Sequence, residues 1–266
     1  MKNEPEREAQ ADIKKIDREI KLNIESNISR AHKERMGQYF TPGNVIDMLL
    51  EILDPKPNEV IIDPSSGCGN ILLHAHDYIY KKYRSVGQNI NGIELDNSLI
   101  EYSNKFHKKL GLYSFIKCDD ALRVNEFDDQ IDVIIGNPPF GKIVDLKTSD
   151  YADQYFTTNK RDRHERIEIL FLEKCIQMLK VGGRMGVIIP DGILGNKSSG
   201  LIRKWILSKG KILAVISLPA ETFMPYTSVK TSALIFEKTI SVLTDYRIFM
   251  AIADTCGHDR RGEENR

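Results

Sequence analysis

Short apolar runs alternate with stretches of helical periodicity along most of the chain. Strand-like runs occupy residues 60–63, 90–95, 114–119, 132–137, 184–190, 212–219 and 232–238. Helical stretches lie between most of these runs, notably at residues 97–110 and 165–180. The runs are nearly continuous in Ile and Val, which is typical of strands that are buried on both faces. This alternation predicts an α/β fold with a mostly parallel sheet and helices on both faces.

Two segments depart from the alternation. Residues 1–36 are rich in charged side chains, and their sparse apolar positions recur at helical spacing, as at Ile13, Ile16 and Ile20. This pattern predicts a short helical N-terminal segment with a narrow apolar stripe. Residues 141–163 are polar and show no periodicity. Loops of that length inside a compact domain are usually functional or mobile.

Composition narrows the class of protein. The 266 residues include 38 basic and 38 acidic side chains, so any basic surface for nucleic acid must be local. The four cysteines are widely spaced and form no C-x-x-C pair, which favours reduced thiols over a disulfide framework or a metal site. No apolar run approaches the ~20 residues of a membrane span, and the charged N-terminus is unlike a signal peptide. We expect a soluble, cytoplasmic protein with no metal and no membrane partner.

The first predicted strand leads into a loop suited to ligand binding. Asp63 ends the strand, and Gly67 and Gly69 follow before a helix. Ligands of open parallel sheets bind beyond the carboxyl ends of the strands, and glycines let the backbone approach them closely. A dinucleotide site is the alternative, but Leu72 stands where the third glycine of G-x-G-x-x-G is needed. Asp63 would also repel a pyrophosphate, whereas it would attract a ligand with an ammonium group.

Acidic residues also end the next two strands. Glu94 follows the glycine turn by about 25 residues and can accept hydrogen bonds from two ribose hydroxyls. Asp119 ends the third strand and can accept a hydrogen bond from an adenine amino group. A ligand with an ammonium group, a ribose and an adenine fits S-adenosylmethionine and does not fit NAD. We therefore predict S-adenosylmethionine as the cofactor.

The fourth strand runs into Asn137, Pro138, Pro139 and Phe140 at the same edge of the sheet. The prolines have a fixed φ and no N–H, so they hold the turn rigid and leave its carbonyls as acceptors. The Asn137 side-chain oxygen and the Pro138 carbonyl can accept both hydrogens of an exocyclic amine, which restores the lone pair of the nitrogen. An exposed Phe140 ring would give a planar base a face on which to stack. The segment predicts an amine clamp with a stacking wall.

These motifs, together with the upstream GQYFTP, resemble the DNA adenine-N6 methyltransferases. DPSSGCGN, GIELD and NPPF follow GQYFTP in the order of that family, and the resemblance extends over about residues 35–262. Within the family, the sequence is most similar to the modification subunits of type I restriction–modification systems. DPSSGCGN departs from the more frequent DPACGTGG by conservative changes. The runs GGRMGVIIPDGIL and LPAETFMPYTSVKTSALIFEK look like the fifth strand and the seventh, hairpin strand of the family.

The resemblance implies a Rossmann-like S-adenosylmethionine-dependent methyltransferase fold with a seven-stranded sheet. Besides Asp63, Glu94 and Asp119, the expected cofactor-binding residues belong to the same motifs: Tyr39, Phe40, Thr41, Pro42, Ser65, Gly67, Gly69, Asn70, Leu95, Ala121 and Asn137. Residues that match Phe40, Thr41 and Pro42 help to bracket the methionine part of the donor in the family. Phe223 matches an aromatic residue that contacts the flipped base.

The implied activity is methyl transfer from S-adenosylmethionine to the N6 amino group of adenine in DNA, directly to a flipped base. The catalytic domain would span residues 37–245, followed by a polar tail at residues 246–266. Family members that read DNA alone carry a further target-recognition region, and none is visible in this sequence. The expected partners are therefore DNA and a separate specificity subunit, with a restriction subunit as a further candidate.

Basic side chains near the clamp are candidates for holding DNA phosphates while a base is flipped, which costs a few kcal/mol. They form two groups: Lys160, Arg161, Arg163 and the nearby Arg166, and Lys197, Arg203 and Lys204.

The residues alone leave other functions open. A similar N-P-P clamp, usually ending in Tyr, occurs in glutamine methyltransferases of translation factors, so a protein glutamine or an RNA amine is an alternative substrate. Phe140 and the GQYFTP motif favour DNA. A non-catalytic assembly subunit could keep the fold, but the intact clamp argues against that function because a scaffold has no use for it.

Overall fold

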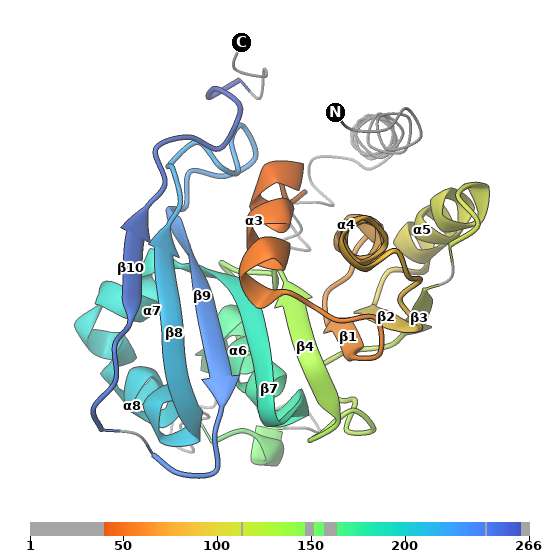
Figure 1. Cartoon of the computed structure of the whole chain (residues 1–266). Coiled ribbons are helices and arrows are strands. Elements are labelled where there is room, and N and C mark those ends of the chain that lie inside the picture. The colour runs from red at the N-terminus through yellow and green to blue at the C-terminus, as the bar shows by residue number, and fades with distance from the viewer. Residues whose placement is uncertain (1–39, 113, 147–151, 157–163, 243, 262–266) are drawn as a thin grey trace.

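The computed structural model of the chain describes residues 40–112, 114–146, 152–156, 164–242 and 244–261 (Figure 1). Its strands are β1 (Val60–Asp63), β2 (Asn89–Glu94), β3 (Phe115–Cys118), β4 (Ile131–Gly136), β5 (Ile143–Asp145), β6 (His164–Arg166), β7 (Leu179–Pro190), β8 (Gly210–Ser217), β9 (Thr231–Lys238) and β10 (Phe249–Ile252). Its α-helices are α3 (Gly43–Leu53), α4 (Asn70–Tyr83), α5 (Asn97–Lys109), α6 (Ile167–Met178), α7 (Asp191–Gly195) and α8 (Gly200–Lys209). The helical segment expected at residues 1–36 lies outside the described residues.

Eight strands form one sheet, in the order β10-β8-β9-β7-β4-β1-β2-β3. Neighbouring strands are parallel except for β9, which runs antiparallel to both β7 and β8. In Figure 1 the arrowheads of β8 and β10 point to the top of the view, and that of β9 points down. The carboxyl ends of all the parallel strands therefore meet at one edge of the sheet.

Helices cover both faces of the sheet, with α3 in front of it and α6 behind it in Figure 1. Neighbouring residues of each central strand pack into opposite layers. In β1, Ile61 packs with the apolar residues of α3 and α4, whereas Ile62 packs with those of α6. In β4, Val133 and Ile135 face the first layer and Ile134 faces the second. Burial on both faces explains the continuous Ile and Val runs and confirms the predicted α/β fold.

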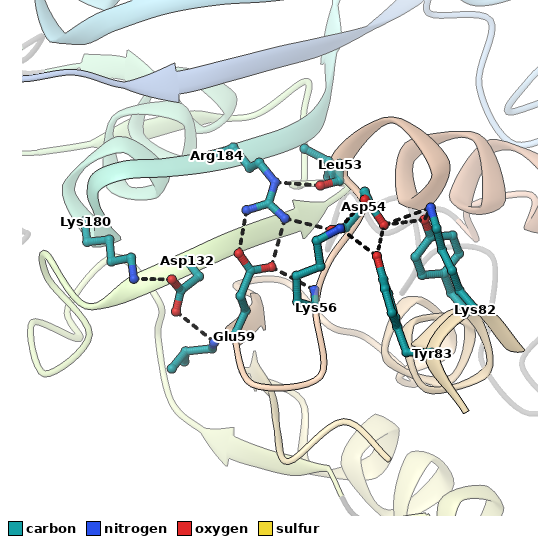
Figure 2. Close-up of polar contacts among 11 residues, drawn as sticks. Leu53, Asp54, Lys56, Glu59, Lys82, Tyr83, Asp132, Lys180 and Arg184 are labelled. Atoms are coloured by element: carbon teal, nitrogen blue, oxygen red, sulfur yellow. Dashed lines mark hydrogen bonds and ion pairs between the residues drawn. The ribbon is translucent and has the colours of Figure 1, made fainter. Parts of the chain in front are cut away.

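Arg184 ties the end of α3 to the amino-terminal edge of the sheet (Figure 2). Its guanidinium donates to both carboxylate oxygens of Glu59, at 2.8 and 2.9 Å. It also donates to the backbone carbonyls of Leu53 and Asp54, at 2.6 and 3.0 Å. Burial alone would raise the pKa of the Asp54 carboxyl, but hydrogen bonds hold it well below its usual range, and their donors are Lys56, Tyr83, Lys82 and Tyr78. This network lies at the edge opposite to the strand ends that form the candidate site.

The structure differs from the prediction in two segments. β10 lies within residues 246–266, which we expected to be a polar tail, and it makes the sheet eight-stranded rather than seven-stranded. It is a short edge strand with exposed Phe249, Met250 and Ile252, so it lacks the buried pattern by which strands are identified from sequence. The polar segment at residues 141–163 also contains regular structure, since β5 pairs with β6 in an antiparallel ladder.

Two further observations apply to the described residues. No helix in them is both long enough and apolar enough to cross a bilayer. No group of three or more His, Cys, Asp or Glu side chains in this part of the chain could hold a metal ion.

Candidate cofactor and amine site

Three predicted site residues meet where the central strands end. Asp63 is the last residue of β1, Glu94 is the last residue of β2, and Asn137 directly follows β4. β1 lies between β2 and β4 and pairs with both in parallel. The topology therefore brings two carboxylates and one amide to neighbouring positions on the same edge of the sheet.

The Asp63 carboxylate is buried at this edge, with only 1% of the residue exposed. Its Oδ1 accepts hydrogen bonds from the Ser65 N–H at 3.0 Å and from the Ser65 hydroxyl at 3.3 Å. Burial raises the pKa of Asp63 to about 7, although the bonds from Ser65 lower it, and the charge of Glu94 raises it further. A Cβ at Gly136 would lie 3.2 Å from this oxygen, so β4 passes close to the carboxylate. A cationic group beside Asp63 would stabilise its charged form.

The loop between β1 and α4 needs glycine at two positions. Gly67 and Gly69 have φ angles of +54° and +77°, in the left-handed region that other residues rarely adopt. At Gly69, a Cβ would also lie 2.1 Å from the Ser103 hydroxyl of α5. At Gly67, a Cβ would meet no described atom within 4 Å, so the backbone there borders open space. The loop can therefore present its backbone closely to a ligand.

Glu94 organises this loop. Its Oε2 accepts a hydrogen bond from the Gly67 N–H at 2.8 Å, and its Oε1 accepts the N–H groups of Leu95 and Asp96, both at 2.9 Å. Burial raises the pKa of the Glu94 carboxyl, although these three backbone bonds lower it. Sequence reasoning expected ribose contacts here and did not foresee that the same side chain orders the backbone.

The remaining predicted cofactor-binding residues of this part of the site follow the ends of β2 and β3: Leu95, Asp119 and Ala121. Asp119 follows β3, and its backbone N–H donates to the Glu94 carbonyl at 3.0 Å. Its carboxylate accepts a hydrogen bond from the Asp120 N–H at 2.8 Å and lies 3.3 Å from the Lys117 ammonium. Ala121 is buried, whereas Leu95 is 58% exposed and offers an apolar surface beside the end of β2.

The segment before α3 reaches this edge from the N-terminal side. Phe40 packs against a small apolar cluster that contains Cys68, Leu73 and Phe106. Pro42 caps α3, and its carbonyl accepts the N–H groups of Val45 and Ile46. The predicted residue Tyr39 lies outside the described residues.

Thr41 is bonded to two predicted site residues. Its carbonyl accepts a hydrogen bond from the Asn70 side-chain amide at 3.1 Å. Its hydroxyl accepts a hydrogen bond from the Asn137 side-chain amide, also at 3.1 Å. Through Thr41, the GQYFTP motif is therefore bonded directly to the clamp segment. The Asn70 side-chain amide is bonded to the backbone of Thr41.

The expectation of an exposed Phe140 ring is wrong for this conformation. Phe140 is 3% exposed and Phe223 is 2% exposed. Their rings meet edge to face, with centroids 6.0 Å apart and an interplanar angle of 73°. Phe223 belongs to the loop between β8 and β9, which thus brings it against the clamp segment. The two predicted base contacts pack on each other.

Among the basic residues predicted to hold DNA phosphates, two arginines are bonded to the chain itself. Arg166 donates to the Ser199 hydroxyl at 2.9 Å, and Arg203 donates to the Ile193 and Asn196 carbonyls, both at 2.8 Å. These two arginines therefore stabilise the region around α7. Lys197 and Lys204 are exposed. Lys160, Arg161 and Arg163 lie outside the described residues.

Two further residues, which we did not predict from the sequence, bond to backbone segments of the site. The Glu168 carboxylate of α6 accepts a hydrogen bond from the Gly141 N–H at 3.2 Å, which holds the end of the clamp segment. The His107 Nε2 of α5 lies 3.3 Å from the Gly69 carbonyl, and burial lowers the pKa of this imidazole. Both residues occupy helical positions, and the sequence pattern gives no signal that distinguishes them from surface positions.

Comparison with known proteins places this arrangement in a family. The sequence profile of the family "N-6 DNA Methylase" matches residues 23–265. The type I restriction enzyme EcoEI methylase subunit of Escherichia coli is 30% identical over 214 residues. That alignment covers 76% of this chain and 42% of the relative, so the chain spans less than half the length of the relative.

Solved structures show the same fold. A Listeria monocytogenes protein described as a class I S-adenosylmethionine-dependent methyltransferase has a TM-score of 0.69 at 25% identity, over 80% of this chain and 64% of that one. The methyltransferase subunit of a type I restriction-modification system from Streptococcus thermophilus has a TM-score of 0.67 at 22% identity, over 85% of this chain and 50% of that one. Fold, strand-end residues and the matched profile agree, and the chain belongs to the N-6 DNA methylase family.

Proposed function

We propose that the chain is the catalytic part of an S-adenosylmethionine-dependent DNA methyltransferase that acts on the N6 amino group of adenine in a restriction–modification system. One observation carries the proposal. The Asn137 amide, which follows β4, lies at the same sheet edge as the buried Asp63 carboxylate of β1 and the Glu94 carboxylate of β2. An acceptor for an amine and an acidic site for a cationic donor therefore share one edge.

The residues at this edge fit S-adenosylmethionine. The pKa of Asp63, raised to about 7, marks a carboxylate that burial destabilises in its charged form and that a cationic ligand would stabilise. The open backbone at Gly67 and the exposed apolar Leu95 offer surfaces for the rest of the molecule. When bound, S-adenosylmethionine supplies an electrophilic methyl group. Asp63, Glu94 and Leu95 would hold it, together with Phe40, Ser65, Gly67, Gly69, Asp119 and Ala121.

The clamp activates the substrate amine. The Asn137 side-chain oxygen and the Pro138 carbonyl would accept the two hydrogens of the exocyclic amine. The nitrogen then approaches tetrahedral geometry, and its lone pair becomes available for attack on the methyl carbon. The rigid Pro138–Pro139 pair keeps the backbone turn and its carbonyl in place, because proline has a fixed φ. No covalent bond to the chain is needed.

Binding of a flipped base requires a change in the aromatic pair. The rings of Phe140 and Phe223 are in edge-to-face contact and both are buried. A base that stacks on Phe140 would take part of the space that Phe223 occupies. We propose that the loop between β8 and β9 moves when the base enters, and that Phe223 then contacts the base.

The chain is proposed to act with other subunits. Its relative from Escherichia coli is named as the methylase subunit of a type I restriction enzyme, and this chain covers 42% of that protein. We propose DNA and a separate specificity subunit as partners, with a restriction subunit as a further one. The isolated chain should then bind the donor but methylate DNA slowly or without sequence selectivity.

A substrate screen tests the proposal. Radiolabelled S-adenosylmethionine is offered with plasmid DNA, RNA or a protein with a glutamine acceptor, each with and without a candidate specificity subunit. We expect label in DNA, recovered as N6-methyladenine by mass spectrometry, and more of it with the partner. Label in protein or RNA alone would contradict the assignment of DNA. Robust site-specific methylation by the isolated chain would contradict the need for a specificity subunit.

A further inference from the structure

Two side-chain hydrogen bonds connect the glycine loop with the clamp. The Asn70 amide, at the first position of α4, donates to the Thr41 carbonyl at 3.1 Å. The Asn137 amide donates to the Thr41 hydroxyl at 3.1 Å. Thr41 is 3% exposed, so water competes little for these bonds. Thr41 is therefore bonded both to the start of α4, which follows the glycine loop, and to the clamp segment.

The bond from Asn137 to Thr41 holds the amide group in place. An asparagine side chain has an NH₂ group that only donates and an oxygen that accepts. Because the NH₂ group of Asn137 is directed to the Thr41 hydroxyl, the oxygen occupies the other branch of the planar amide. Only the oxygen can accept a hydrogen from a substrate amine. Loss of the Thr41 hydroxyl would release the NH₂ group, and the amide with its oxygen would then no longer be held in this position.

We propose that Thr41 is a positioning residue that holds the Asn137 amide in place and thereby sets the rate of methyl transfer. This role rests on the proposed function of Asn137 in the amine clamp. It differs from a contact between Thr41 and the methyl donor, which the family resemblance implies. A positioning role lowers the rate of the chemical step when the hydroxyl is lost, whereas a donor contact lowers donor affinity.

The hydroxyl of Thr41 can be removed without releasing its backbone. Asn70 holds the Thr41 carbonyl. The next residue, Pro42, caps α3, and its carbonyl accepts the N–H groups of Val45 and Ile46 at 3.0 and 3.1 Å. None of these bonds involves the Thr41 side chain. A substitution of the side chain therefore tests the bond to Asn137 rather than the course of the chain.

The test compares Thr41→Val, which loses the hydroxyl but keeps the branched shape, with Thr41→Ser, which keeps the hydroxyl. Single-turnover methyl transfer to DNA and donor affinity by calorimetry are measured on the full chain with the partner that supports wild-type transfer. Thr41→Val should lower the transfer rate by about 10- to 100-fold, because small misplacements of a reacting group cost about that much. Donor affinity should remain close to that of the wild type. Thr41→Ser should retain most of the rate.

Thr231→Val is the matched control. Thr231 is 0% exposed, and its hydroxyl oxygen makes no hydrogen bond within the described part of the chain. This variant removes a buried threonine hydroxyl without removing a bond to Asn137, so its transfer rate should equal that of the wild type. Thr41→Ala, which lacks the hydroxyl and adds no bulk, is a second test variant in case Thr41→Val does not fold.

The outcomes separate the inference from the proposed function. Wild-type transfer by Thr41→Val and Thr41→Ala would overturn the positioning role, and so would a loss confined to donor affinity. An equal loss in Thr41→Ser or in Thr231→Val would also overturn it, because the hydroxyl bond to Asn137 would then not be the cause. Absence of transfer from the wild-type protein to DNA would instead contradict the proposed function.

Discussion

The Glu94 carboxylate accepts a 2.8 Å hydrogen bond from the backbone N–H of Gly67, between the end of β2 and the glycine loop. The other oxygen of the same carboxylate accepts the N–H groups of Leu95 and Asp96. One acidic side chain thus orders the loop after β1 and the turn after β2. These two backbone segments border the proposed donor site, so loss of the carboxylate affects the shape of the site as well as its charge.

Glu94→Gln should weaken donor binding by about 10- to 100-fold. The substitution replaces one accepting oxygen by a donor, and hydrogen bonds to charged groups contribute about 1.5–3 kcal/mol. Calorimetric titration with S-adenosylmethionine measures the effect. Glu101→Gln, on the exposed side of α5, is the control and should bind like the wild type. Equal affinity of Glu94→Gln and wild type would show that the carboxylate does not shape the donor site.

Donor affinity should depend on pH through Asp63. Burial raises the pKa of this carboxyl to about 7 in the free protein. A cationic donor prefers the ionised form, so below pH 7 binding must release a proton. The affinity should therefore fall as the pH falls, by up to about tenfold per pH unit, and should level off above the pKa. Titrations over the range from about pH 5.5 to about pH 8.5 measure this profile.

Asp63→Asn provides the control for this profile. The variant should bind the donor more weakly at high pH and should lose the dependence that Asp63 causes, because the amide does not titrate. A wild-type affinity that stays constant across the same range would contradict the contact between Asp63 and the cationic part of the donor.

Gly69→Ala should destabilise the protein more than Gly67→Ala. Both residues have positive φ, so either alanine incurs a backbone cost of about 1–2 kcal/mol. Only the Cβ at residue 69 would approach the Ser103 hydroxyl, to 2.1 Å. The midpoint of thermal unfolding should therefore fall further for Gly69→Ala. Adding Ser103→Ala should recover part of the difference, and no recovery would mean that this contact is not the cause.

Arg184→Met should lower the free energy of unfolding by about 2–4 kcal/mol, since it leaves the Glu59 carboxylate and the last carbonyls of α3 without their shared donor. Arg184 and Glu59 are 20% and 19% exposed, so solvent replaces the lost bonds only in part. Chemical denaturation measures the change. Arg260→Met breaks an ion pair with Glu221 in which Arg260 is 77% exposed, and it should have little effect. Similar losses in both variants would argue against a special role of the network in Figure 2.

The sequence predicted the central fold because its strands are buried on both faces, which leaves a strong apolar pattern. It also predicted that Asp63, Glu94 and Asn137 end neighbouring strands, since parallel strands bring their carboxyl ends to one edge. The short edge strand β10 carries exposed apolar residues and gave no such pattern. The burial of Phe140 depends on the loop that carries Phe223, a contact across 83 residues that local patterns do not encode.

Local sequence patterns also could not predict the polar contacts between segments that are distant in the sequence. The bond between Thr41 and Asn137 joins positions 96 residues apart. Arg166 and Arg203 read as surface cations in the sequence, yet they bond to the hydroxyl and carbonyl groups of the α7 region. Such pairings follow from the packing of α6, α7 and α8 rather than from the composition of any one of these segments.

The Asn137→Ala variant tests the central claim most directly. Single-turnover methyl transfer to adenine in DNA and donor affinity are measured on the same preparation. Loss of the acceptor should lower transfer by at least about 10²–10³-fold, as for other preorganised hydrogen-bonding groups, while the donor binds almost as in the wild type. Transfer at the wild-type rate, or loss of donor binding together with transfer, would contradict the role of Asn137 as the amine clamp.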